Sequence, residues 1–336
     1  MQKEINPIFI IAEAGVNHNG KLHLALKLCD AAKDAGVDAV KFQTFKTEKV
    51  LKRGVEMADY QKKNLDSAIS QFDMAKQLEL SYNDFVTIKE HCDNIGIQFL
   101  STPDEEASLD FLYNLGQTLI KVGSGEINNI PFLRKIGNKH CNVILSTGMS
   151  CLGDVEKAYN TLIISGAKSV ALLHCTTNYP CPMEEVNLKA MLTLKDALKA
   201  KVGYSDHTLG IEMPIAAVAL GAQIIEKHFT LDNTMVGPDH KASLEPQELK
   251  KMVEAIRNIE KALGDGIKKP NESEIKIQQL IKKSIVANTT IKVGEMFTES
   301  NLTVKRAGDG ISPELWDMII GRIAIRNFKE EDLIII

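Results

Sequence analysis

Polar side chains recur in this sequence directly after short apolar runs, where they could do chemistry together. Lys41 in AVKFQT and Lys121 in LIKVGS interrupt runs that are otherwise apolar. Burying an ammonium group costs free energy, so each lysine either reaches out of its strand end or meets an anion. One bound anion would explain both. Hydroxyl groups at other strand ends would complete a site for a phosphate or phosphorylated carboxylate: Thr102, Ser124, Ser146 and Ser205.

Two histidines end neighbouring runs, His207 after KVGYSD and His228 within IIEKHF. A single histidine in such a place is more often a hydrogen-bonded structural residue. Two on adjacent strands, near Asp206 and Glu226, could instead hold a divalent cation with open coordination positions. Zinc would accept the histidines, and a site completed by water and substrate oxygens suits Mn²⁺ or Mg²⁺ as well.

Other polar residues occupy the ends of these runs or the loops after them. Glu13 and Gln43 lie at the ends of the first two runs. Asp239, in TMVGPDHKASLEP, is either part of an ordinary Gly-Pro-Asp turn or a ligand for a substrate hydroxyl. Tyr179, in TNYPCP, is by itself better explained as a loop residue.

Eight apolar runs position these side chains. Each run is followed by a segment with helical periodicity, often with glycine where the helix would stop. Eight strand–helix alternations with near-continuous apolar strands predict a parallel (β/α)₈ TIM barrel, whose chemistry lies at the carboxyl ends of the strands. The runs are 9–15, 38–44, 97–102, 118–124, 142–147, 170–175, 201–206 and 222–229.

The chain changes character after the last barrel helix. We predict a barrel domain over 1–263, a polar linker with Gly and Pro over 264–276, and a small β-rich module over 277–336. About 60 residues leave such a module a thin core. We therefore expect the module to pack against the barrel or against a second subunit.

Composition excludes several classes of function. The 336 residues are 44% hydrophobic and 25% charged, with a formal net charge of −4, typical of a soluble globular protein. That charge favours neither nucleic acid nor an anionic membrane as a partner. The N-terminal apolar run is too short for a signal peptide or a membrane span, and the six cysteines form no CxxC pair. We therefore expect a cytoplasmic protein with reduced thiols.

Many motifs in order resemble those of the sialic acid synthases. They include AEAGVNHNG, VKFQTF, KVGSGE, LLHCTTNYP, GYSDHT, IEKHFTLD and GPDHKASLEP, and IKVGEMFTESNLTVKR resembles the antifreeze-like SAF domain of the same family. The resemblance implies condensation of phosphoenolpyruvate with an N-acetylmannosamine-type sugar, and a domain-swapped homodimer.

The resemblance also implies a role for each matching residue. His207 and His228 would bind Mn²⁺ or Mg²⁺, and Glu13 would act close to the reacting carbons. Gln43, Tyr179 and Asp239 would hold the sugar, and Arg306 would reach the sugar's N-acetyl group from the partner. The residues implied for phosphoenolpyruvate are Lys41, Thr102, Lys121, Ser124, Ser146 and Ser205.

The sequence leaves the exact sugar open. GSGE, in place of SFE, argues against the pseudaminate synthases, whereas N-acetylneuraminate and N,N'-diacetyllegionaminate synthases both fit. Asp104 stands where the family often has Phe, Thr177 where some members have Asn, and Ala307 where Pro is common. Two other classes remain: an aldolase that forms a Schiff base through Lys41 or Lys121, and a non-catalytic sugar-binding protein.

Overall fold

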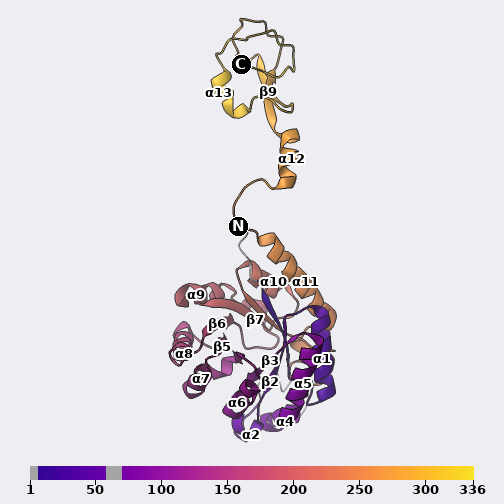
Figure 1. Cartoon of the computed structure of the whole chain (residues 1–336), viewed down its shortest axis with the longest axis vertical. Helices are drawn as coiled ribbons and strands as arrows, with labels where there is room; N and C mark the ends of the chain where they lie inside the picture. The colour runs from indigo at the N-terminus through magenta and orange to yellow at the C-terminus, as the bar shows by residue number, and fades with distance from the viewer. Residues whose placement is uncertain (1–6, 58–69) are drawn as a thin grey trace. The chain divides into compact units, whose positions relative to one another are not determined.

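The computed structural model describes residues 7–57 and 70–336. The chain divides into two compact units, the first extending to Asp265 and the second running from Gly266 to Ile336. In Figure 1 the first unit consists of strands surrounded by helices, and the second is smaller. Within the described ranges, no helix is both long enough and apolar enough to cross a membrane.

Eight parallel strands build the first unit, in the order β3-β2-β1-β8-β7-β6-β5-β4. β3 and β4, at the two ends of this order, also contact each other, which closes the sheet into a barrel. Every predicted run forms a strand, so the (β/α)₈ prediction is confirmed. The strands are β1 (Phe9–Gly15), β2 (Ala39–Thr44), β3 (Gln98–Pro103), β4 (Leu119–Val122), β5 (Asn142–Ser146), β6 (Ser169–His174), β7 (Lys201–Asp206) and β8 (Ile224–His228).

Helices follow the strands, and their ends obey local sequence rules. In α5, Ser81 and Asp84 form a capping box, and Gly96 ends the helix at φ 73°, a conformation that glycine adopts without steric cost. The helices of the first unit are α1 (Leu22–Ala35), α2 (Thr47–Val50), α4 (Gln71–Leu78), α5 (Tyr82–Ile95), α6 (Glu106–Asn114), α7 (Ile130–Gly137), α8 (Leu152–Ile164), α9 (Lys189–Leu198), α10 (Glu212–Ala219) and α11 (Pro246–Leu263).

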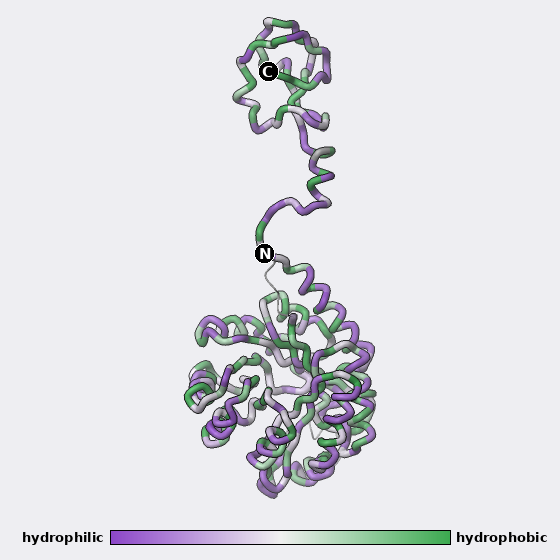
Figure 2. The backbone as a smooth tube through the Cα atoms, viewed as in Figure 1, coloured by the Kyte–Doolittle hydropathy of each residue, from purple (hydrophilic) through white to green (hydrophobic). Residues whose placement is uncertain are grey.

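Apolar side chains fill both faces of the barrel sheet. Ile11, Leu100, Ile144 and Leu173 belong to a cluster distinct from the large one that includes residues of the surrounding helices. Figure 2 shows the strands of the first unit as mainly hydrophobic and much of the helical surface as hydrophilic. Alternate strand residues point into the barrel, so the polar residues at the strand ends follow directly on this packed interior.

The second unit has its own small core around an antiparallel strand pair. Ile285, Phe297 and Phe328 are fully buried in it. Part of the segment expected as a linker is helical, because Asn271 and Glu274 form a capping box that starts α12. The elements are α12 (Glu272–Ile281), β9 (Lys283–Ala287), β10 (Leu302–Arg306) and α13 (Trp316–Ile319).

Candidate active site

A cavity lies at the carboxyl ends of the barrel strands. Asp239 lines an adjoining cavity, which shares Gln43, Tyr179 and His228 with the first. Arg306 ends β10 in the second unit, so the barrel alone does not supply it. The first cavity brings together the other predicted site residues: Glu13, Lys41, Gln43, Thr102, Lys121, Ser124, Ser146, Tyr179, Ser205, His207 and His228.

Two lysines and two glutamates form a buried network at the base of this cavity. Lys41 Nζ lies 2.6 Å from Glu13 Oε2 and 3.7 Å from Glu226 Oε2. Lys121 Nζ lies 3.5 Å from the other oxygen of Glu226. Glu226 therefore stands between the two ammonium groups. Because each lysine has a carboxylate nearby, both can remain charged while buried.

Hydroxyl groups complete the network. Lys41 donates to Thr102 Oγ1 at 3.2 Å, and Lys121 donates to Ser146 Oγ at 2.8 Å. Ser205 Oγ donates to Glu226 Oε1 at 2.9 Å. The two ammonium groups and these hydroxyls together offer donors to an oxyanion, the arrangement that phosphate and carboxylate ligands require.

A bulge in β1 directs Glu13 toward its partners. The pairing of β1 with β2 shifts register between Glu13 and Gly15, and Gly15 has φ 52°. A Cβ at Gly15 would lie 3.3 Å from Glu13 Oε1 and 3.4 Å from Gln43 Nε2. Glycine thus leaves room for the hydrogen bond of 3.2 Å from Gln43 Nε2 to Glu13 Oε1.

Burial and neighbouring charge separate the pKa values of the two carboxyl groups. Burial raises the pKa of Glu13 to about 7, against the attraction of Lys41. Burial also acts to raise the pKa of Glu226, but Lys121 and Lys41 outweigh it and hold that pKa at about 2. Glu13 can therefore gain or lose a proton near neutral pH, whereas Glu226 stays ionised.

The two lysines also differ. Burial acts to lower the pKa of Lys41, but the carboxylates of Glu13 and Glu226 outweigh it, so the pKa lies above its usual range. Burial lowers the pKa of Lys121, and Glu226 offsets this only in part. Lys41 is thus the more strongly held cation of the two.

The two histidines adjoin this network as neutral imidazoles. Their ring centroids lie 5.4 Å apart, and burial lowers both pKa values, that of His228 well below its usual range. Nδ1 of His207 donates to the Thr176 carbonyl at 2.6 Å, which leaves Nε2 as the free lone pair. Nδ1 of His228 is buried without a hydrogen-bond partner among the described residues. Two unprotonated ring nitrogens are therefore available to a cation.

The structure does not complete a metal site from protein ligands alone. Over residues 7–57 and 70–336, no group of three or more His, Cys, Asp or Glu side chains is placed to hold a metal ion. His207 and His228 would leave the remaining positions to water or substrate. This agrees with an open site and does not identify the metal.

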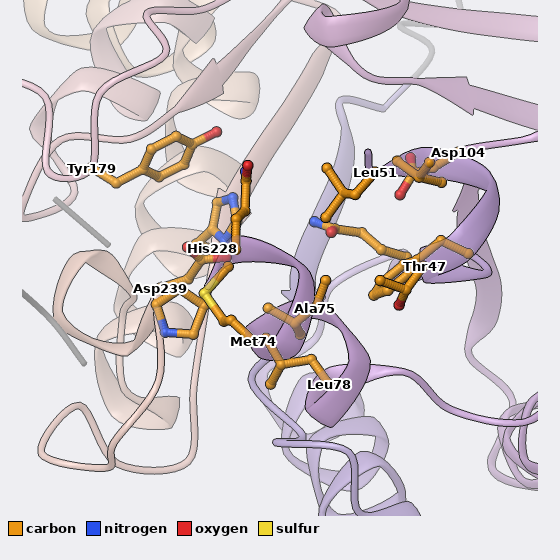
Figure 3. A pocket seen from close by; sticks show the side chains of 15 residues that line it. Thr47, Leu51, Met74, Ala75, Leu78, Asp104, Tyr179, His228 and Asp239 are labelled. Carbon is orange, nitrogen blue, oxygen red and sulfur yellow. The ribbon is translucent and has the colours of Figure 1, made fainter. Parts of the chain in front are cut away.

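The adjoining cavity has a polar side and an apolar side. Figure 3 shows Tyr179, His228 and Asp239 on one side, with Asp104, Leu51 and Thr47 across from them. Met74 and Leu78 of α4 belong to the apolar wall. Burial raises the pKa of Asp239 to about 6. A ligand in this cavity would meet carboxyl groups and hydrocarbon within a short span.

Two residues of the site were not assigned a role from the sequence. Glu226 is two residues before His228 on the same strand, so both side chains point to the same face, and this alternation is a signal that could have identified it. The side chain of Lys227, which lies between them in the strand, points to the opposite face, and its Nζ lies 2.5 Å from Asp206 Oδ2. Asp104 lines both cavities, which no local pattern indicates.

Comparisons with known proteins agree with this geometry. A sequence model of the NeuB family matches residues 28–268, and one of the SAF domain matches residues 282–334. The chain is 53% identical to the N,N'-diacetyllegionaminic acid synthase of Campylobacter jejuni subsp. jejuni, over 97% of this chain and 98% of that protein. It is 34% identical to human N-acetylneuraminate-9-phosphate synthase, over 98% and 92%.

Solved structures show the same family relationship. The N-acetylneuraminic acid synthetase of Leptospira borgpetersenii, crystallised with citrate, superimposes with a TM-score of 0.71 at 36% identity, covering 82% of this chain and 93% of that one. The spore coat polysaccharide biosynthesis protein spsE of Bacillus subtilis has a TM-score of 0.67 at 35% identity, over 99% and 95%. The family match, the identity over nearly the full length and the barrel site together show that this chain belongs to the NeuB family.

Proposed function

We propose that this protein condenses phosphoenolpyruvate with an N-acetylmannosamine-type aldose, giving a nine-carbon sialic acid and phosphate. The observation that carries this proposal is the pair of buried lysines, Lys41 and Lys121, set around Glu226 beside two neutral histidines. The product is of the N-acetylneuraminate type, and N,N'-diacetyllegionaminate is the alternative within the same reaction. The identity of 53% to an N,N'-diacetyllegionaminic acid synthase favours that alternative.

Phosphoenolpyruvate binds between the two lysines. Its phosphate and carboxylate are both anions, and Lys41 can shift from Glu13, and Lys121 from Glu226, toward them. Ser124 lines the same binding site, and its hydroxyl is held in position because it accepts a hydrogen bond from the Gly148 amide at 2.9 Å. The proposed ligands for phosphoenolpyruvate are Lys41, Thr102, Lys121, Ser124, Ser146 and Ser205.

His207 and His228 would hold Mn²⁺ or Mg²⁺. The fit rests on two neutral rings with free nitrogens, one of them the buried, unpartnered Nδ1 of His228. When bound, such a cation supplies positive charge where the aldehyde oxygen becomes negative.

Residues of the chain then transfer protons and stabilise charge during the reaction. C3 of phosphoenolpyruvate bonds to the aldehyde carbon, water adds at C2, and the bond from C2 to the phosphate oxygen breaks. Glu13, with its pKa of about 7, accepts one proton of the attacking water and returns it to the former aldehyde oxygen, and the proton of the new C2 hydroxyl leaves with phosphate as C2 becomes a ketone. Lys41 and Lys121 stabilise the charge that leaves with phosphate.

The sugar binds across the two cavities, held by Gln43, Tyr179 and Asp239. We assign Arg306 to the same sugar from the partner of a domain-swapped homodimer. Exposed apolar side chains on the second unit, among them Val293 and Ile325, support an assembly that covers them. The proposed domains of this assembly are the barrel at 1–263, the linker at 264–276 and the SAF domain at 277–336.

All six cysteines are unpaired, which supports a cytoplasmic location.

One experiment tests the reaction. Phosphate release is measured from phosphoenolpyruvate with ¹⁸O in the bridging C–O–P position, with N-acetylmannosamine and with 2,4-diacetamido-2,4,6-trideoxymannose. Carbon–oxygen cleavage places the label in phosphate. Label retained in the organic product, or no phosphate with either sugar, would contradict the proposal.

A Schiff-base aldolase is the second candidate, because the lowered pKa of Lys121 suits an amine nucleophile. Borohydride with a keto acid would trap a lysine adduct in that case. Loss of activity in EDTA and its recovery with Mn²⁺ would exclude it.

A further inference from the structure

A second cavity lies beside the proposed reacting groups. It adjoins the first cavity, because both are lined by Gln43, Asp104, Tyr179 and His228. An aldehyde placed near Glu13 and His228 would therefore extend its far carbons over this shared rim. The groups at those carbons are what distinguish one mannosamine-type sugar from another.

Asp104 stands at that rim with a carboxylate that the fold does not use. None of the described residues gives its side chain a hydrogen bond or an ion pair; its backbone N–H donates to Thr44 at 3.2 Å. The start of α6 is capped by Glu105 instead, whose carboxylate accepts from Ala107 and Ser108. Asp104 is therefore not needed as a cap, and its oxygens face the cavity as free acceptors.

The nearby cations are already bound. Lys41 pairs with Glu13 at 2.6 Å, and Lys121 donates to Ser146 at 2.8 Å. The adjoining cavity has no lysine or arginine among the described residues that line it, and it contains a second carboxyl group, Asp239. Two carboxyl groups with no cation among these residues favour an uncharged sugar with a donor for Asp104 over a sugar phosphate.

Most of the remaining wall is hydrocarbon. Leu51 follows α2, Met74 and Leu78 come from α4, and Val16 and Phe45 line the same cavity. Such a wall suits methyl groups, and it offers hydroxyls only Gln71 and Thr47, whose hydroxyl already donates to Glu79. A C4 acetamido group supplies both an N–H donor and a methyl group, and a 6-deoxy carbon supplies a second methyl. N-acetylmannosamine has hydroxyls at both positions.

We propose that Asp104 is a specificity-determining residue, which accepts a hydrogen bond from the N–H of a C4 acetamido group while the wall of α2 and α4 packs against the acetyl and C6 methyl groups. This inference rests on the proposed function and narrows its substrate to 2,4-diacetamido-2,4,6-trideoxymannose.

The test compares kcat and KM for the two sugars in wild type, Asp104→Ala and Asp104→Asn. We expect Asp104→Ala to lower kcat/KM for the diacetamido sugar about 10- to 100-fold, mainly through KM, because a hydrogen bond to a buried carboxyl group is lost. kcat/KM for N-acetylmannosamine should fall less, because its C4 hydroxyl can donate to Asp104 but brings no acetyl group to the apolar wall, and KM for phosphoenolpyruvate should stay the same. Asp104→Asn keeps one acceptor oxygen and should recover part of the loss.

Asp110→Asn, at an exposed position of the same α6, is the matched control and should change neither sugar. Equal losses for both sugars, or no loss for either, would overturn the inference while leaving the reaction intact. Wild type that releases no phosphate with either sugar would overturn the proposed function itself.

Discussion

Glu13 and Lys41 are direct partners on the parallel strands β1 and β2, and their charged groups lie 2.6 Å apart in a buried site. The pair combines a carboxyl group that titrates near neutrality with an ammonium group held charged. A proton acceptor for water and a cation for the phosphate are therefore placed side by side by strand register alone.

Glu13→Gln should lower kcat about 10²- to 10⁴-fold, because an amide cannot take the proton of the attacking water. In wild type, kcat should rise with pH up to about 7, where Glu13 becomes ionised, and then level off. Phosphate release measured from pH 5.5 to 9 gives the profile. A rising limb that persists unchanged in Glu13→Gln would show that another group titrates.

Much of this arrangement could be predicted from the sequence, because it follows from period-two alternation and from the rule that barrel chemistry lies at the strand ends. Lys41, Lys121 and His228 interrupt apolar runs, and such interruptions can be recognised from the sequence alone. Glu226 also interrupts an apolar run, so its position could be recognised in the sequence. Its role, however, depends on its place between two lysines that come from other strands. Asp104 lines the same cavity as Met74 and Leu78 of α4, and no sequence spacing predicts that they share it.

Two buried lysines on this barrel should respond differently to the same substitution. Lys121→Met should raise KM for phosphoenolpyruvate about tenfold or more and lower the thermal midpoint less than Lys227→Met does, because Glu226 keeps Lys41 as a second cation. Lys227→Met should instead lower stability by about 3–5 kcal/mol, because it leaves the fully buried Asp206 unpaired. Steady-state kinetics and thermal unfolding of both variants separate the two roles, and a reversed pattern would contradict the assignment of inward and outward faces.

His207→Ala should abolish turnover and weaken Mn²⁺ binding about 10- to 100-fold, since one of two neutral ligands is lost. Calorimetric titration with Mn²⁺ measures the affinity, and circular dichroism checks the fold. His174→Ala is the matched control: His174 also ends a strand and also has a pKa lowered by burial, but it bonds the Val186 carbonyl. Equal losses of Mn²⁺ affinity in both variants would refute the metal role of His207.

Asp104 should make the protein less stable as pH rises. Burial raises its pKa from 3.8 to about 7, so the folded state binds more protons than the unfolded state between these values. Its contribution is complete below about pH 4 and is lost as pH rises toward 7. Asp104→Asn removes the ionisation and should be more stable than wild type by about 1–2 kcal/mol at pH 8, with allowance for water in the cavity, and equal to it at pH 4. Thermal unfolding at both pH values is the measurement, and a gain at pH 4 as large as that at pH 8 would contradict the assignment.

Arg306 provides the test of the domain-swapped dimer. Arg306→Ala should raise KM for the sugar and leave KM for phosphoenolpyruvate unchanged, because only the sugar reaches the partner's residue. Glu13→Gln and Arg306→Ala, each poorly active at low sugar concentration, are then mixed under conditions that allow subunit exchange. If the arginine acts in trans, a mixed dimer joins an intact barrel with an intact Arg306, and about a quarter of all sites regain wild-type activity. If Arg306 acts on its own barrel, every site in the mixture still carries one of the two substitutions. Mixing would then restore nothing, and the swapped arrangement would be excluded.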